Sequence, residues 1–173
     1  MPSITGIEEY IGLIKTDPSK TLGVKIGDKE INPGDYLPKL AIEAAATPTL
    51  SFPVSDTIAK HVAICVDLDG PFPSFNFLSP ILHWIQSDLQ TSFLTTNQPV
   101  IASYVGPGPP PGSGPHRYVF LLYKQPSEFR LDQYVPSGGK EFGIMARMRY
   151  DLSAFEEKAR LGKPIAVNYF TSN

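Results

Sequence analysis

The chain has 173 residues, the usual length of one domain, and its composition excludes several classes of protein. Fifteen basic and 17 acidic residues give a formal net charge of −2, which provides no basic surface for nucleic acid or for an anionic membrane. The single cysteine, Cys65, rules out an internal disulfide, and its apolar neighbours predict a buried thiol.

The sequence shows no targeting or membrane-spanning segment. Residues 1–10 lack the cationic start and apolar core of a signal peptide. Every apolar run is shorter than the roughly 18 residues that a membrane span needs. We therefore expect one soluble domain over residues 1–173, in a reducing compartment, the cytoplasm.

Two segments, at about 3–15 and at 151–161, have the spacing of short amphipathic helices. In the first, the apolar positions recur at helical intervals: Ile7, Tyr10, Ile11 and Ile14. Each segment begins with a pair spaced as a capping box: Thr5 with Glu8, and Ser153 with Glu156. We expect both helices at the periphery of the molecule.

Between these helices, Pro and Gly interrupt the chain repeatedly and the apolar runs are short. The runs that we expect to form strands are 22–26, 49–52, 61–69, 80–85, 100–105, 117–124 and 165–170. Short runs at this spacing favour a sandwich of antiparallel strands. Eighteen prolines do not fit central strand positions, so the connections must be long and structured.

In two of the predicted strands, pairs of polar side chains fall on the same face. Alternation in HVAICVDLD places Asp67 and Asp69 together on one face, at the end of an apolar strand. The two carboxylates either belong to a site or accept backbone N–H groups in the turn that follows. In HRYVFLLYK the same rule places His116 and Tyr118 on one face. His116 and His83 are each either loop hydrogen-bonding groups or functional imidazoles.

The Pro- and Gly-rich run GPGPPPGSGPH is either a flexible linker or a structured loop. We expect a structured loop, because the run connects Tyr104 directly to a strong strand pattern. The nucleotide-binding motifs GxxxxGK[ST] and strand-linked GxGxxG are absent, as is the GxSxG motif of hydrolases. The histidines and Cys65 lack metal-ligand spacing, so we expect neither a metal nor a cofactor.

Three motifs in one order resemble the phosphatidylethanolamine-binding protein family. They are D-x-D-x-P from Asp67 to Pro71, His83-Trp84, and YVGPGPPPGSGPHRYVFLLYKQ at 104–125. LGKPIAVNYF also looks like the last strand of the family, so the resemblance covers roughly 49–170. It implies a mainly β fold, an antiparallel, Greek-key-like β-sandwich with a few peripheral helices and one anion pocket.

The resemblance also implies which residues form the pocket: Asp67, Asp69, Pro71, His83, Gly108, Pro109, Pro110, His116 and Tyr118. Backbone N–H groups, a tyrosine hydroxyl and two imidazoles can donate to a phosphate or a carboxylate. No lysine or arginine is required. We therefore expect weak binding of a small anion, stronger at mildly acidic pH because histidine then carries its proton.

The sequence departs from the family pattern at two points near this pocket. DPDAP reads DLDGP, with Gly70 in place of alanine, and Phe72-Pro73 replaces the Ser-Arg that often follows. Pro80-Ile81-Leu82 replaces the residues that precede the pocket histidine. Both changes make a wall of the pocket more apolar. They resemble filamentous-fungal members, some of which are encoded with secondary-metabolite pathways and assist reactions of anionic, apolar intermediates such as maleic anhydrides.

Three functions remain open at this point. The first is a binding protein for a phospholipid head group or another small anion. The second is an auxiliary or catalytic protein, in which His83 or His116, held by Asp67, acts as a general acid or base on a carboxylated or anhydride substrate. The third is inhibition of a protein partner, a carboxypeptidase or a kinase, through surface contacts. Whether the chain is an enzyme stays open.

Overall fold

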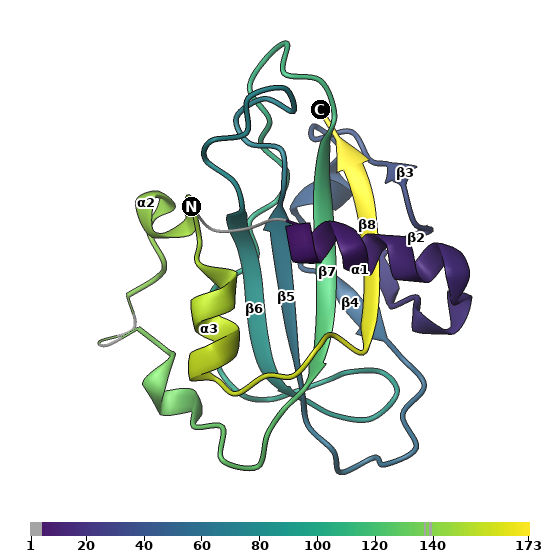
Figure 1. Ribbon diagram of the computed structural model, residues 1–173, viewed down its shortest axis with the longest axis vertical. Helices are drawn as coiled ribbons and strands as arrows, with labels where there is room; N and C mark the ends of the chain where they lie inside the picture. The colour runs from purple at the N-terminus through teal and green to yellow at the C-terminus, as the bar shows by residue number, and fades with distance from the viewer. Residues whose placement is uncertain (1–4, 137, 139) are drawn as a thin grey trace.

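The computed structural model describes residues 5–136, 138 and 140–173, leaving out the side chains of residues 5, 42 and 43. The described chain forms two β-sheets and several short helices (Figure 1). The strands are β1 Gly23–Ile26, β2 Lys29–Ile31, β3 Asp35–Tyr36, β4 Thr49–Ser51, β5 His61–Asp67, β6 Ile81–Leu89, β7 His116–Lys124 and β8 Ala166–Ser172. The helices are α1 Thr5–Thr16, α2 Ile144–Arg147 and α3 Leu152–Lys158, with short 3₁₀ turns at η1 Pro18–Lys20, η2 Ile42–Ala45 and η3 Leu131–Gln133.

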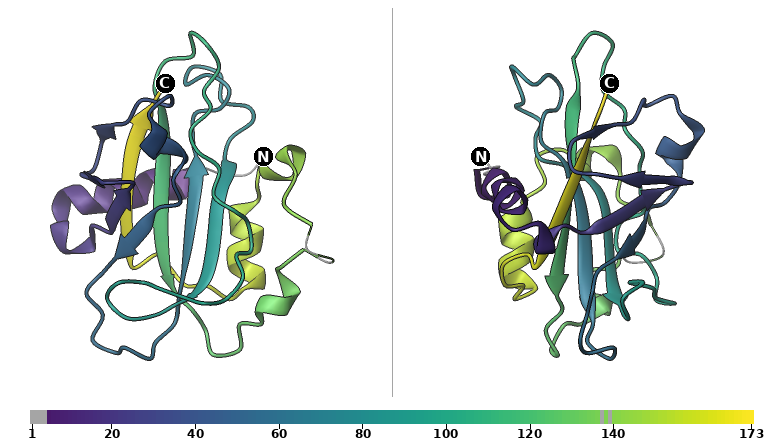
Figure 2. Two further views of the ribbon diagram at one scale, coloured as in Figure 1. Left: turned by 180° about the vertical axis from the view of Figure 1, so that it is seen from behind. Right: turned by 90° about the vertical axis from the view of Figure 1, so that its right-hand side faces the viewer.

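The larger sheet has the order β3-β8-β7-β5-β6, and the smaller sheet has the order β2-β1-β4. All pairs are antiparallel except β3 with β8, so the expected antiparallel sandwich is confirmed. Helices α1 and α3 cover one face of the larger sheet, and the smaller sheet covers the other face (Figures 1 and 2). Strand β5 is therefore buried along its whole length.

Two apolar cores lie on opposite faces of the larger sheet. The core beneath α1 and α3 contains the alternate β5 residues Val62, Ile64 and Val66, together with Leu68 just after the strand. The core between the two sheets contains Ala63 and Cys65 from the same strand. The alternation predicted for this strand is confirmed. Burial raises the pKa of the Cys65 thiol well above its ordinary value, so Cys65 is the inert buried thiol that its neighbours predicted.

Several predicted elements differ from the structure. The apolar run at 100–105 is not a strand and contributes only one bridge, from Ala102 to Ile85. The side chain of Asp151, not of Ser153, caps α3 by accepting from the Ala154 amide at 2.9 Å. The capping box predicted there is wrong because Glu156 accepts from the Tyr123 hydroxyl instead, at 2.7 Å. The capping box predicted at Thr5 involves a side chain outside the described residues.

The Pro- and Gly-rich segment between β6 and β7 is a structured loop, as predicted. Lys39 Nζ donates to the Pro109 carbonyl at 2.6 Å, and the Ser113 amide donates to the Pro110 carbonyl at 3.1 Å. Gly106 packs so closely that an added Cβ would lie 2.7 Å from the Ala44 carbonyl oxygen, which explains glycine there. Among the described residues, no helix is long and apolar enough to cross a membrane.

Candidate functional site

A cavity of about 200 Å³ is lined by the residues where β5 ends and where β6 and β7 begin, together with the loops of that edge. These strand ends lie toward the top of Figure 1. The connection from β5 to β6, the Pro- and Gly-rich loop and α2 supply its walls. Its polar lining is Asp67, His83, His116 and Arg147, and the other lining residues are Gly70, Pro71, Leu78, Ile81, Leu82, Val105, Gly106, Gly108, Pro110, Ile144 and Met148. Six of the nine predicted site residues therefore line one cavity.

The register of the sheet brings residues of three strands together beside this cavity. Asp67, the last residue of β5, pairs with Ile81 of β6 and Tyr118 of β7. Asp67 Oδ2 lies 2.8 Å from His116 Nδ1. Because a carboxylate only accepts, Nδ1 carries the hydrogen. The opposite ring atom, His116 Nε2, is buried and has no hydrogen-bond partner among the described residues.

His83 projects from β6 and is held in a similar way. Its Nδ1 atom lies 2.6 Å from the Val105 carbonyl oxygen, so this nitrogen also carries a hydrogen and Nε2 remains available. Burial is the main cause that lowers the pKa of His83, although the bond to Val105 and the charge of Asp67 oppose it. His83 is therefore neutral at neutral pH.

Tyr118 supports the site from behind rather than lining the cavity. Its ring meets His83 edge-on, with centroids 5.0 Å apart, and stacks on Phe170 at the same distance. Its hydroxyl is buried without a hydrogen-bond partner in the described part of the chain. Burial, followed by the charge of Asp67, raises the pKa of this hydroxyl, which keeps its proton.

Asp69 and Pro109 also lie outside the lining. β5 ends at Asp67, and Asp69 points to Arg117: its Oδ1 accepts from Nη2 and its Oδ2 from Nε, each at 2.8 Å. The prediction that Asp67 and Asp69 share a face is wrong, because strand alternation stops where the strand ends. Arg117 also contacts Glu8 of α1 at 3.1 Å, so Asp69 joins the edge of the site to the first helix.

Arg147 is a site residue that the sequence did not reveal. Arg147 lies on α2 and is only 2% exposed. Its guanidinium donates from Nε to the Phe142 carbonyl, from Nη1 to the carbonyls of Leu82 and His83, and from Nη2 to the Ser103 hydroxyl. No described carboxylate lies within ion-pair distance, and Glu141 is reached only through Ser103. The expectation that the site needs no arginine is therefore incomplete, because a buried cation lines it.

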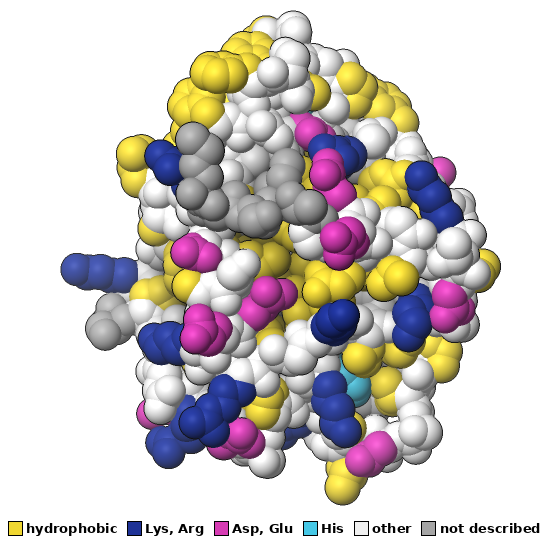
Figure 3. All heavy atoms as spheres, viewed as in Figure 1, with side chains coloured by type: hydrophobic (Ala, Val, Ile, Leu, Met, Phe, Trp, Pro, Cys, Tyr) yellow, Lys and Arg dark blue, Asp and Glu magenta, His cyan; other side chains and the backbone are white. Residues whose placement is uncertain are grey.

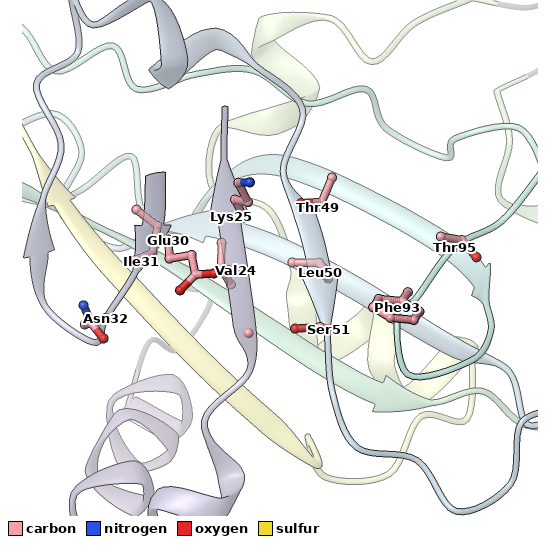
Figure 4. Close-up of a pocket in the computed structure, with 11 residues that line it drawn as sticks. Val24, Lys25, Glu30, Ile31, Asn32, Thr49, Leu50, Ser51, Phe93 and Thr95 are labelled. Atoms are coloured by element: carbon pink, nitrogen blue, oxygen red, sulfur yellow. The ribbon is translucent and has the colours of Figure 1, made fainter. Parts of the chain in front are cut away.

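A larger hollow, of about 520 Å³, lies over the smaller sheet and contains none of the predicted site residues (Figure 4). Its lining comes from β1, β2 and β4 together with Phe93 and Thr95, and it holds no histidine. Among the described residues, no three His, Cys, Asp or Glu side chains gather as a metal site. The smaller cavity, which holds two imidazoles, a carboxylate and a guanidinium, is the better candidate site.

The profile of the family described as phosphatidylethanolamine-binding protein matches residues 27–170. This chain belongs to the phosphatidylethanolamine-binding protein family. The match confirms the resemblance carried by the three motifs and begins upstream of the residues on which that resemblance was based.

Related proteins come from fungi and plants. The phomoidride biosynthesis cluster protein N of Talaromyces stipitatus is 33% identical, over 76% of this chain and 73% of that protein. CEN-like protein 1 of Nicotiana tabacum is 32% identical, over 90% of this chain and 82% of that protein. The crystal structure of carboxypeptidase Y inhibitor complexed with its cognate proteinase has a TM-score of 0.69 and 25% identity, over 98% of this chain and 94% of that chain. The expected fold and the likeness to filamentous-fungal members are confirmed.

The two departures from the family pattern pack against each other in this family member. An added Cβ at Gly70 would clash with Ile81 Cδ1 and would lie 3.3 Å from Ile81 Cγ1. Gly70 therefore makes room for Ile81, a lining residue of the cavity. With Leu78, Leu82 and Met148, Ile81 gives the cavity an apolar part of its lining.

Proposed function

We propose that this chain binds a small anionic group, either a phosphate head group or a carboxylate, between His83 and His116. The observation that carries the proposal is His116 Nε2, which is buried beside the cavity without a partner. Buried polar atoms are nearly always hydrogen-bonded, so an unpaired ring nitrogen at a cavity indicates a group that a ligand satisfies.

The hydrogen bonds already present define what the ligand must supply. In each imidazole, Nδ1 donates to a fixed acceptor, the carboxylate of Asp67 or the carbonyl of Val105. In the neutral ring Nε2 only accepts, and in the protonated ring it donates. We therefore expect an anion to bind most tightly when an imidazole takes up a proton with it, because Nε2 can then donate to the anion. Arg147 supplies positive charge on the same cavity, and the apolar lining at Ile81 suits a carbon skeleton next to the anionic group.

The test is an NMR titration of the imidazole signals, first with phosphoethanolamine and then with dimethylmaleate. The chain has three histidines. His61 is an internal control, because it lies at the start of β5, at the other end of the strand from Asp67, and is 4% exposed. His83→Ala and His116→Ala variants assign the two site signals.

We expect His83 and His116 to shift together while His61 does not. The ligand that saturates at the lower concentration distinguishes a head group from a carboxylated metabolite. If neither site signal moves with either anion at pH 6, the proposed site is wrong. A shift of all three signals would indicate a general effect of ionic strength and would equally contradict the proposal.

A second function, general acid–base catalysis, is favoured by the Asp67–His116 pair and by the relative encoded in a biosynthetic cluster. Asp67 fixes Nδ1–H, which leaves His116 Nε2 as a base. On a cyclic anhydride, water attacks one carbonyl carbon while Nε2 accepts a water proton. The ring C–O bond then breaks, and the product is a dicarboxylate with release of two protons to solvent.

Hydrolysis of dimethylmaleic anhydride, followed by its ultraviolet absorbance, tests this second function. We expect His116→Gln to lower the protein-dependent rate by at least about 100-fold, the typical contribution of a general base. His61→Gln is the matched control and should leave the rate unchanged. A rate in the wild type equal to that in buffer would exclude this reaction while leaving anion binding untouched.

Inhibition of a peptidase is supported by the similarity to the structure of carboxypeptidase Y inhibitor with its cognate proteinase. A protein surface would carry such a function, rather than the cavity. Residual activity of carboxypeptidase Y in an excess of this protein is the direct measurement. Full activity would remove this hypothesis.

A further inference from the structure

Three exposed phenylalanines lie in the connection between β5 and β6. Phe72, Phe75 and Phe77 are 40%, 65% and 48% exposed, and the rings of Phe75 and Phe77 lie 4.9 Å apart. We call residues 70–79 the phenylalanine loop. Large apolar side chains that cluster on a surface indicate a contact with another apolar phase or partner.

The base of this loop is fixed and forms part of the cavity. The Leu78 amide donates to the Gly70 carbonyl at 3.1 Å, and the Gly70 amide donates to Ser79 Oγ at 2.9 Å. Gly70, Pro71 and Leu78 line the cavity. The three phenylalanines therefore extend from a wall of the candidate site.

A second apolar group lies on α2, another wall of the same cavity. Ile144 and Met145 are 60% and 78% exposed, and Ile144 lines the cavity. Figure 3 shows hydrophobic side chains gathered along the upper left edge of the molecule, over the β5–β6 connection, and further ones lower on the left. Apolar surface thus flanks the cavity on two sides.

The phenylalanine loop carries no charge. From Gly70 to Ser87 the sequence contains no Asp, Glu, Lys or Arg. Phenylalanines on an uncharged, protruding segment are suited to the boundary between lipid head groups and acyl chains. The net charge of −2 provides no attraction to an anionic membrane, so the surface that fits is zwitterionic.

The size of the apolar tip argues against a second copy of this chain. At the exposed fractions given above, three phenylalanine side chains present roughly 300 Å² of apolar surface. A stable protein interface buries about 800 Å² from each partner, a little more than half of it apolar, so the tip alone presents less apolar surface than a dimer interface needs. A bilayer has no such requirement, because a few side chains can insert without a complementary surface.

We infer that the phenylalanine loop docks this protein on a zwitterionic phospholipid bilayer, with the mouth of the cavity facing the head groups. The docking goes beyond the proposed function and does not depend on it, since the loop can insert whether or not the cavity is occupied. If the proposed ligand is a head group, docking brings the cavity to it.

The test is flotation of the protein with vesicles of phosphatidylcholine and phosphatidylethanolamine. We expect the triple variant Phe72→Ser, Phe75→Ser, Phe77→Ser to reduce the vesicle-bound fraction by at least about tenfold. Phe93→Ser is the matched control, because Phe93 is 76% exposed but lies beside the smaller sheet (Figure 4). This control should bind as the wild type does, and binding should not change with added salt or with phosphatidylserine.

A second measurement keeps the test valid if the triple variant fails to fold. In Phe75→Trp, lipids brominated in the acyl chain should quench the added tryptophan. They should leave the wild type unchanged, because its single tryptophan, Trp84, is 4% exposed. Quenching in Phe75→Trp therefore reports insertion of the loop itself.

Three results would overturn the inference. In the first, the wild type binds phosphoethanolamine in solution but does not float with vesicles, which leaves the cavity proposal intact. In the second, Phe93→Ser weakens flotation as much as the triple variant does. In the third, sedimentation shows a dimer of the wild type that the triple variant loses, which would identify a second copy as the occupant.

Discussion

Asp67 and His116 are 49 residues apart in the chain, yet Asp67 Oδ2 and His116 Nδ1 lie 2.8 Å apart. The other oxygen of the same carboxylate, Oδ1, accepts from the Asp69 amide at 2.8 Å. Asp67 therefore closes the turn after β5 and orients a histidine at the same time. The sequence left these two roles as alternatives, and the structure assigns one oxygen to each.

The first prediction concerns this pair. In Asp67→Asn the side-chain amide can donate to His116 Nδ1, which would move the ring hydrogen to Nε2. We expect nitrogen-15 NMR of the neutral imidazole to show the hydrogen on Nδ1 in the wild type and on Nε2 in the variant. We also expect the free energy of unfolding to fall by about 2 kcal/mol, because a charge-assisted buried hydrogen bond is lost. An unchanged tautomer would show that Asp67 does not control this ring.

The second prediction concerns pH and stability. Burial is the main cause that lowers the pKa of both His61 and His83. Above about pH 6.5, the ordinary value, these groups are neutral in both the folded and the unfolded chain. As the pH falls below it, the unfolded chain takes up protons first, so the free energy of unfolding decreases until the folded pKa values are passed.

The measurement is urea unfolding of the wild type and of His83→Gln between pH 8 and pH 5. Comparing the two proteins cancels the groups that they share. We expect the wild type to lose more stability over this range than the variant does. Parallel curves would mean that His83 titrates alike in the folded and unfolded chain.

The third prediction concerns the packing of Gly70 against Ile81. An added Cβ at position 70 overlaps with the end of the Ile81 side chain, so Gly70→Ala should lower the free energy of unfolding by about 1 kcal/mol. Ile81→Val removes the clashing methyl group. In that background Gly70→Ala should be neutral or stabilising by up to about 1 kcal/mol, because alanine restricts the unfolded chain. A double-mutant cycle measures the coupling, and additive effects would disprove the proposed contact.

The fourth prediction concerns Arg147. Arg147→Lys keeps the charge but loses the planar fork that reaches the carbonyls of Phe142, Leu82 and His83. We expect the free energy of unfolding to fall by about 2 kcal/mol, as expected when buried acceptors are left unpaired. Anion affinity should fall less than in Arg147→Gln, which removes the charge as well. Equal losses of affinity would show that the charge of Arg147 does not act on the ligand.

The predicted site residues that line the cavity lie where local pattern and motif agree. Asp67 and His116 lie within two residues of the ends of the predicted strands, and the loop with Gly108 and Pro110 carries the most specific motif. Asp69 was misplaced because alternation holds only within a strand, and β5 ends at Asp67. Pattern alone does not reveal where the last residue of a strand turns.

Arg147 and the run at 100–105 show that a sequence pattern predicts neither burial by tertiary packing nor strand pairing. Arg147 lies 64 residues from His83 in a segment without strong periodicity, and its burial results from the packing of α2 beside β6. The run at 100–105 is apolar because Ile101 and Ala102 are buried, not because they pair along a strand. Burial and strand pairing leave the same apolar signature in a sequence.

The register of β5 between β6 and β7 places Asp67, Ile81 and Tyr118 in one row across the sheet. Amides that are paired within a sheet are protected from exchange with solvent, whereas loop amides exchange through local opening. The strand residues at the cavity are thus tied more closely to global stability than the exposed residues of its loops. Substitutions of exposed side chains in the loops, such as Phe72, Phe75 and Phe77, can change what docks beside the cavity at little cost to the fold, while changes to the strand residues affect folding and recognition together.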